Sequence, residues 1–162
     1  MTADPAARAL AAADALGLAY AVTRHGPVGS LAEAAAARGI EPRQILKTMV
    51  VRVTDGDHRL VLVPGDREIA WPKLRSLLGV NRLSMPSAEA AYEVTGFMRG
   101  TITPLGTTTP LPVIIDASAQ GPVSIGAGAH GVALTVDAAA LVSALEATVA
   151  DVTETTDAPP AS

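Results

Sequence analysis

The fold of this chain is decided by residues 45–64, which read ILKTMVVRVTDGDHRLVLVP. Two runs in this stretch, 45–53 and 59–64, are rich in Val, Ile and Leu with the β-branched content that favours strands. Between them lies Thr54-Asp55-Gly56-Asp57, which has the composition of a turn. The stretch therefore predicts a β-hairpin.

Other helical and strand-like patterns surround this hairpin on both sides. Ser30 and Glu33 form the capping box of a helix that Gly39 should end, and Asp137 can cap the last helix. Helices are expected over residues 5–16, 30–39, 71–78, 88–94 and 137–148, and further strands over 18–23, 111–116, 123–127 and 132–136. Because they lack a regular βαβ alternation, the sequence predicts a mixed α+β domain.

Composition limits the class of protein. A chain of 162 residues with 49% hydrophobic content suits one domain, which we expect over residues 1–152, with a disordered Thr/Pro/Ala/Asp-rich tail over 153–162. The absence of cysteine excludes disulfides and thiolate nucleophiles. The first residues lack the pattern of a signal peptide, and no apolar run approaches the ~18 residues of a membrane span. We therefore expect a cytoplasmic protein with no membrane partner.

Charge and aromatic content argue against a broad nucleic-acid interface. The net charge is −4, basic residues do not cluster, and aromatic residues make up 2% of the chain. A protein of this kind lacks the electrostatic footprint and the stacking platforms of an independent nucleic-acid binder. No DNA partner is expected, and any contact with RNA should be limited to an end.

Several familiar catalytic motifs fail in context. Residues 126–131 read GAGAHG and match the dinucleotide fingerprint G-x-G-x-x-G, but a predicted strand follows where a helix is needed. The G-x-S-x-G elbow of serine hydrolases is absent, since the nearest stretch has one residue too many before Ser124. His25, His58 and His130 lie too far apart in sequence to suggest a metal site. No metal and no cofactor are expected.

Two features leave a functional and a structural interpretation open. Period-two alternation places Lys47 on the same strand face as Met49 and Val51, so its ammonium group either guards a sheet edge or points into a pocket to hold a phosphate or an oxyanion. The loop Gly100-Thr101-Ile102-Thr103-Pro104-Leu105-Gly106 is either a stiff turn or a cradle of backbone amides for a substrate.

Taken together, these stretches resemble the YbaK/prolyl-tRNA-synthetase-associated editing domain family over about residues 9–151. The resemblance rests on the order and spacing of Lys47-Thr48, Thr95-Gly96-Phe97 before the loop 100–106, Leu111-Pro112-Val113-Ile114-Ile115-Asp116, and Ile125-Gly126-Ala127-Gly128 with Gly131. It implies a mixed, partly curled β-sheet flanked by helices, around a pocket for the aminoacylated 3′ end of a tRNA.

The resemblance also implies an activity and a set of site residues. The activity is trans-editing deacylation, chiefly removal of Cys from Cys-tRNA(Pro) by positioning the ester for substrate-assisted cleavage, with prolyl-tRNA synthetase as a possible partner. Lys47, Gly100 and Thr101 would be catalytic. The substrate would contact His25, Thr48, Ile102, Thr103, Pro104, Asp116, Gly126, Gly128 and His130, with Asp116 as pocket wall or support.

Two departures from the family pattern keep alternatives open. Thr101 stands where the family has a second glycine, so its side chain could narrow the pocket or shift the preference from Cys to Ala. His130 replaces a residue that is usually basic, which could alter RNA contact or pH dependence. A non-catalytic module that binds aminoacyl-tRNA or a synthetase, and a degenerate family member, remain alternatives to the enzyme.

Overall fold

The structure is a computed structural model and describes residues 4–156. Five α-helices and a single 3₁₀ turn occur in this range: α1 Pro5–Ala15, α2 Leu31–Arg38, η1 Pro42–Gln44, α3 Trp71–Leu78, α4 Ala88–Thr95 and α5 Ala138–Leu145. The strands are β1 Ala21–Arg24, β2 Leu46–Thr54, β3 Asp57–Pro64, β4 Arg67–Ile69, β5 Val113–Asp116, β6 Pro122–Gly126, β7 Val132–Asp137, β8 Thr148–Ala150 and β9 Thr153–Thr155. No helix among the described residues is long and apolar enough to cross a membrane.

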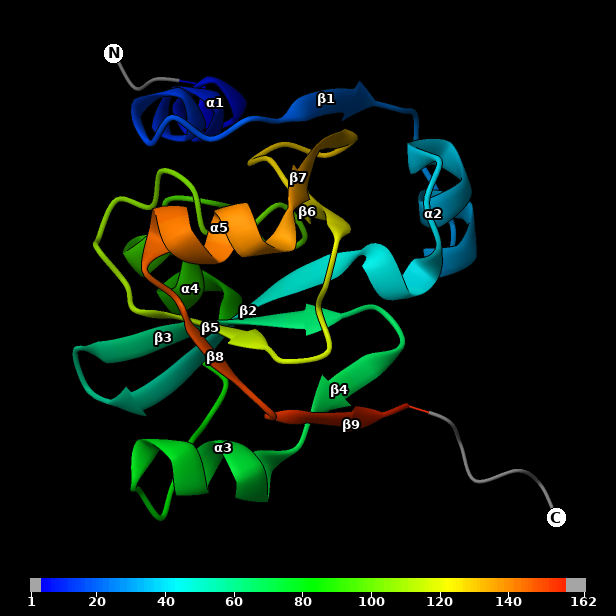
Figure 1. Cartoon of the computed structure of the whole chain (residues 1–162). Helices are drawn as coiled ribbons and strands as arrows, with labels where there is room; N and C mark the ends of the chain where they lie inside the picture. Colours follow the sequence, from blue (N-terminus) through cyan, green and yellow to red (C-terminus); the bar gives the residue numbers. More distant parts are fainter. Residues whose placement is uncertain (1–3, 157–162) are drawn as a thin grey trace, which may run out of the picture.

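The strands form three sheets. The largest has the order β2-β3-β5-β8, in which β2 and β3 are antiparallel and β5 is parallel to both β3 and β8. A second, antiparallel sheet has the order β1-β7-β6, and β4 pairs with β9. A parallel bridge between Ile45 and Ser124 joins the two larger sheets, so that together they curl (Figure 1). The predicted mixed, partly curled sheet with flanking helices is confirmed.

The centre of the large sheet is buried on both faces, which explains the continuous apolar runs at 60–64 of β3 and 113–115 of β5. One face contributes to the main core with the second sheet and with α1, α4 and α5, and the fully buried side chains there include Phe97, Leu62 and Ile125. The other face packs under α3 and the β4–β9 pair, around Val61 and Leu74. Figure 1 shows α5 and α3 on separate sides of this sheet.

Most predicted elements are confirmed, and the helix ends follow the expected chemistry. The hydroxyl of Ser30 accepts a hydrogen bond from the amide of Glu33, and Gly39 ends α2 with φ of 70°. The Glu33 carboxylate accepts from the amide of Gly29 rather than from that of Ser30. The first strand begins later than predicted because the amide of Leu18 still bonds to the carbonyl of Ala13 and closes α1.

The C-terminal predictions need correction. The last helix ends at Leu145 instead of residue 148, because Glu146 adopts a left-handed conformation with φ of 52° and the chain turns to place β8 beside β5. The tail predicted to be disordered from 153 instead begins with β9, whose residue Thr153 is fully buried against β4. The rest of that predicted tail, 157–162, lies outside the described residues.

Candidate functional site

A cavity of about 610 Å³ opens along the outer edge of β2, a size typical of ligand sites. Strand β2 is at the edge of its sheet, so one side of its backbone lacks a strand partner over most of its length. That side is closed at one end by the Ile45–Ser124 bridge and at the other by the bridge between Arg52 and Ser84. The cavity lies between these two bridges and is therefore a defined opening in the sheet edge.

The lining of this cavity is apolar and cationic. It consists of Arg38, Ile45, Leu46, Lys47, Thr48, Met49, Val50, Met85, Pro86, Ser87, Ala88, Ala91, Arg99, Gly100, Ile102 and Gly126. Three of these residues are basic and none is acidic, although the chain as a whole has more acidic than basic residues. Within residues 4–156, none of the three cations forms an ion pair. The cavity is thus built to receive an anionic group.

Arg38 is the most constrained of the three cations. It is half-buried at the end of α2, where Nη1 donates to the buried hydroxyl of Ser124 at 3.1 Å and Nε faces Nε2 of His25 at 3.5 Å. Nδ1 of the same His25 ring lies 2.8 Å from the carbonyl of Gly26. Burial lowers the pKa of Arg38, yet an arginine stays charged at neutral pH. These contacts fix an uncompensated guanidinium group in the cavity wall.

Lys47 lies at the rim of the cavity. Its register partner on β3 is Val63, and its side chain is exposed on the face that carries Met49 and Val51. The predicted alternation is therefore confirmed, and the exposed ammonium group is placed at a cavity rather than at an unoccupied edge. Thr48 projects from the opposite face, and its buried hydroxyl has no hydrogen-bond partner among the described residues. A buried hydroxyl without a partner is costly.

The loop 100–106 contributes backbone amides to the cavity. Gly100 and Ile102 both line it, and within the described chain their N–H groups donate to no protein atom. Gly126 permits this arrangement, since a Cβ there would lie 3.2 Å from the carbonyl oxygen of Ile102. Among the described residues, two loop amides at the cavity therefore lack a protein acceptor, and backbone donors of this kind can stabilise a developing oxyanion.

Three loop residues do not reach the cavity as predicted. Thr101 is 4% exposed, and both its hydroxyl and its amide donate to the carbonyl of Met98, at 2.7 and 2.9 Å. Its side chain therefore neither narrows the cavity nor offers a free donor. Thr103 and Pro104 are buried outside the lining, where the Thr103 hydroxyl accepts from the amide of Leu105. Thr103 and Pro104 therefore support the conformation of the loop from its buried side, away from the cavity.

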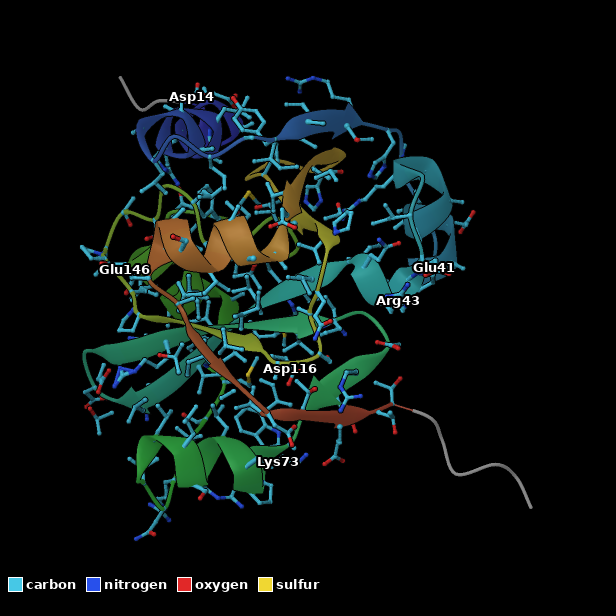
Figure 2. All side chains as sticks on the ribbon, viewed as in Figure 1. Asp14, Glu41, Arg43, Lys73, Asp116 and Glu146 are labelled. Atoms are coloured by element: carbon cyan, nitrogen blue, oxygen red, sulfur yellow. The ribbon has the colours of Figure 1, made fainter. Side chains whose placement is uncertain are left out.

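The remaining predicted contacts also lie away from the lining. Gly128 has φ of 89° and packs so closely that a Cβ would meet the carbonyl of Pro5 at 2.7 Å, so its role is packing. Asp116 is buried beneath β8 and β9, where Figure 2 labels it, and supports the fold rather than the cavity wall. His25 stands behind Arg38, and His130 lies 3.4 Å from where a Gly100 Cβ would be.

Sequence reasoning missed Arg38, Arg99 and the wall formed by residues 85–88 and Ala91 of α4. A basic residue in the last turn of a helix interacts favourably with the helix dipole. The position of Arg38 in the sequence therefore gave no indication of a binding site. This wall, of which only Ala88 and Ala91 belong to α4, becomes part of a site only when the fold brings it to the cavity that β2 also lines.

Comparisons with known proteins show the family of this chain. Residues 25–144 match the aminoacyl-tRNA editing domain family. The chain belongs to that family. The editing-domain match contains every residue that lines the cavity, from Arg38 to Gly126.

Relatives of this editing domain are found both as separate proteins and within synthetases. The crystal structure of a candidate trans-editing enzyme for prolyl tRNA synthetase superposes with a TM-score of 0.84 at 28% identity, covering 95% of this chain and 99% of that one. Proline–tRNA ligases of Bacillus licheniformis and of Geobacter sp. are 33% and 32% identical over 107 and 101 residues, 65% and 62% of this chain. The match spans only 18% of the length of either ligase.

Proposed function

We propose that this protein is a trans-editing deacylase that removes a small, wrongly attached amino acid, chiefly Cys from Cys-tRNA(Pro). The observation that carries the proposal is the cavity: over residues 4–156 its lining holds three cations without an ion-pair partner and no carboxylate, and two backbone amides beside it lack a protein acceptor. The family membership and the similarity to a candidate trans-editing enzyme support the choice of an aminoacyl-tRNA as the substrate.

Binding of the aminoacylated 3′ end would use the charge of the cavity. Lys47, exposed at the rim, is placed to contact the phosphate of the terminal nucleotide. Arg38 has guanidinium N–H groups left over after its bond to Ser124 and adds a second cationic contact.

The chemistry would rest on positioning and on electrostatic stabilisation. As the nucleophile attacks the ester carbon, the carbonyl oxygen gains negative charge, which the amides of Gly100 and Ile102 would stabilise. The bond from the carbonyl carbon to the ribose oxygen then breaks, and that oxygen takes up the proton lost by the nucleophile. Among the described residues that line the cavity, none is Asp, Glu, His or Cys. The substrate is therefore the favoured source of the assisting group.

Two nucleophiles are compatible with this arrangement. The thiol of an attached Cys can attack its own carbonyl carbon and give a cyclic thioester. Alternatively, water activated by the neighbouring ribose hydroxyl can attack and release the free amino acid. Only the second route is open to Ala, so an Ala-tRNA(Pro) editor would use water. Because Thr101 does not enter the cavity, it supplies no steric reason to favour Ala over Cys.

Prolyl-tRNA synthetase is the partner we propose, in a cytoplasmic setting. The isolated chain carries a net charge of −4, and three of its 12 Lys and Arg residues line the cavity. Such a surface can hold the 3′ end but offers little attraction for the body of a tRNA. A synthetase that already binds the tRNA would supply the rest of the affinity.

A non-catalytic binding module remains the second candidate. It is favoured by the loop amide of Thr101, which is committed to Met98 and is lost as an oxyanion donor. In that case the cavity would bind a charged 3′ end without turnover.

The test is a deacylation panel in which the purified protein is incubated with Cys-, Ser-, Ala- and Pro-tRNA(Pro). We expect release of Cys and sparing of Pro. Faster release of Cys than of the nearly isosteric Ser would support thiol assistance, and equal release would indicate water. Binding without release from any of the four would replace the enzyme by the binding module.

A further inference from the structure

A second cavity, of about 420 Å³, adjoins the first and shares Lys47, Met49 and Met85 with it. Its other walls come from the start of α3, with Trp71, and from the β4–β9 pair. The two cavities therefore meet at Lys47, whose ammonium group stands at their common rim. Figure 1 shows α3 and the β4–β9 pair together on one side of the large sheet.

The chemistry of the second cavity differs from that of the first. It contains two carboxylates, Glu68 on β4 and Glu154 on β9, which are direct register partners in the antiparallel pair. Like charges placed directly opposite each other destabilise a sheet. Within the described range neither glutamate has an ion-pair partner, and both are exposed. Two carboxylates offer hydrogen-bond acceptors and no donor, so this cavity favours a ligand that donates hydrogen bonds.

Trp71 gives this cavity an aromatic wall. It is the only tryptophan in the chain, and part of its ring packs on the core around Leu74 while the rest lines the cavity. An exposed indole face binds unpaired nucleobases by stacking, irrespective of sequence. The low aromatic content of the chain is thus compatible with a single base-stacking site, at Trp71 in the second cavity.

We propose that the second cavity binds the penultimate nucleobase of the tRNA 3′ end, the second cytosine of CCA. The base stacks on Trp71, and its N4 amino group donates to Glu68 or Glu154. The phosphate between this cytosine and the terminal adenosine lies at Lys47, and the adenosine with its amino acid occupies the first cavity. This inference rests on the proposed function, because it assumes that an aminoacyl-tRNA end enters the first cavity.

The charges make this order of groups the favourable one. A phosphate in the second cavity would face two carboxylates, whereas a phosphate at the shared rim meets Lys47. Cytosine presents an amino donor at its N4 position, and a glutamate carboxylate accepts from it. Uracil presents an acceptor at the same position and would leave both carboxylates unpaired. The cavity should therefore discriminate between the two pyrimidines.

Trp71 allows a direct test, because all tryptophan fluorescence of the protein comes from this site. The probe is an acceptor-stem RNA hairpin with a single-stranded ACCA end, titrated into the full chain. We expect quenching by this RNA, about 5- to 100-fold weaker binding when the penultimate base is removed, and at least about 5-fold weaker binding when it is uracil. Equal quenching by all three RNAs, or quenching by none of them, would overturn the proposal.

Variants separate this proposal from the proposed function. Trp71→Ala should raise KM for deacylation about 5- to 100-fold with little change in kcat, and Trp71→Phe should restore most of the loss. Glu68→Gln combined with Glu154→Gln should abolish the preference for cytosine. Tyr92→Ala, an exposed aromatic change outside both cavities, should leave KM unchanged. If the protein deacylates and Trp71→Ala leaves its KM unchanged, the nucleobase site is refuted and the proposed function stands. If the protein shows cytosine-dependent quenching but no deacylation, the proposed enzyme activity is refuted and the nucleobase site stands.

Discussion

The carboxylate of Asp116 holds the C-terminal strands on the large sheet. It accepts hydrogen bonds from the amide and hydroxyl of Ser118 and from the amide of Val152, and it lies 3.8 Å from Nε of Arg67. Burial raises the pKa of Asp116, but the hydrogen bonds from Ser118, Val152 and Thr153 together lower it by more than burial raises it. The pKa of Asp116 therefore lies below its usual value of 3.8. The ionised form is therefore the one that stabilises the fold.

Asp116→Asn should destabilise the protein by about 2 kcal/mol at neutral pH, because an amide places a donor among donors. A folded-state pKa below 3.8 means that the contribution is complete above that pH and is lost as the pH falls through the folded value. The variant should accordingly lose less stability than wild type on acidification. Urea unfolding at pH 7 and pH 3 checks this, and parallel losses in the two proteins would contradict it.

Single residues differ in how well sequence reveals them. Lys47 could be identified because a lysine within an apolar strand breaks the local pattern, and Gly100 and Gly126 because glycines mark close approaches. Thr101 was misplaced, since the rotamer that sends its hydroxyl to Met98 depends on the loop conformation. Arg38 can be distinguished from an ordinary basic residue at a helix end only in the structure, where it contacts Ser124.

At the scale of elements, helix α1 fastens the loop that carries the candidate oxyanion donors. Nε of Arg8 donates to the carbonyl of Gly106 and Nη2 to that of Gly96, both at 2.7 Å. The guanidinium carbon also lies 4.4 Å from the centre of the Phe97 ring. One side chain thus connects α1 to both ends of the segment 96–106.

Arg8→Met keeps the aliphatic stem but removes these bonds, so we expect a loss of about 1.5–3 kcal/mol of stability. Looser positioning of the amides of Gly100 and Ile102 should lower kcat about 10-fold or more in protein that is still folded. Thermal unfolding and single-turnover deacylation measure the two effects. Arg82→Met, an exposed change outside both cavities, is the control, and equal behaviour of the two variants would refute the role of Arg8.

Elements were predictable where their ends carry local signals. The caps at Ser30, Ser87 and Asp137 and the turn at 54–57 mark boundaries that the chain itself specifies. The end of α5 was missed because Glu146 takes the left-handed conformation normally given to glycine. Strands β4 and β9 were missed because each has three residues and exists only by pairing with the other.

At the scale of the whole molecule, the cavity differs in charge from the chain as a whole: of the described residues, three basic ones and no acidic one line it, whereas the net charge of the chain is −4. If the three cations of the cavity neutralise at most three phosphates, the logarithm of tRNA affinity should fall with the logarithm of salt with a slope no steeper than about −2. Fluorescence titrations between roughly 50 and 200 mM salt measure the slope. A much steeper slope would reveal an RNA surface outside the cavity.

The site as a whole could not be predicted from sequence, although several of its parts could. It forms where the edge of β2 meets the start of α4, the loop near Gly100 and the end of β6, segments separated by long stretches of chain. The α+β class followed from local patterns. The cavity depends on the two bridges that close the sheet edge at Ile45 and Arg52, and neither bridge has a local signature.

The most direct test of the account is the rate of Cys-tRNA(Pro) deacylation by Lys47→Ala beside Lys73→Ala. Both lysines are exposed, but only Lys47 lines the cavities, whereas Lys73 pairs with Asp151 at 3.0 Å. We predict that Lys47→Ala loses about 100-fold or more in rate with stability within about 0.5 kcal/mol of wild type, and that Lys73→Ala keeps its rate. A folded Lys47→Ala protein that deacylates at the wild-type rate would contradict the account.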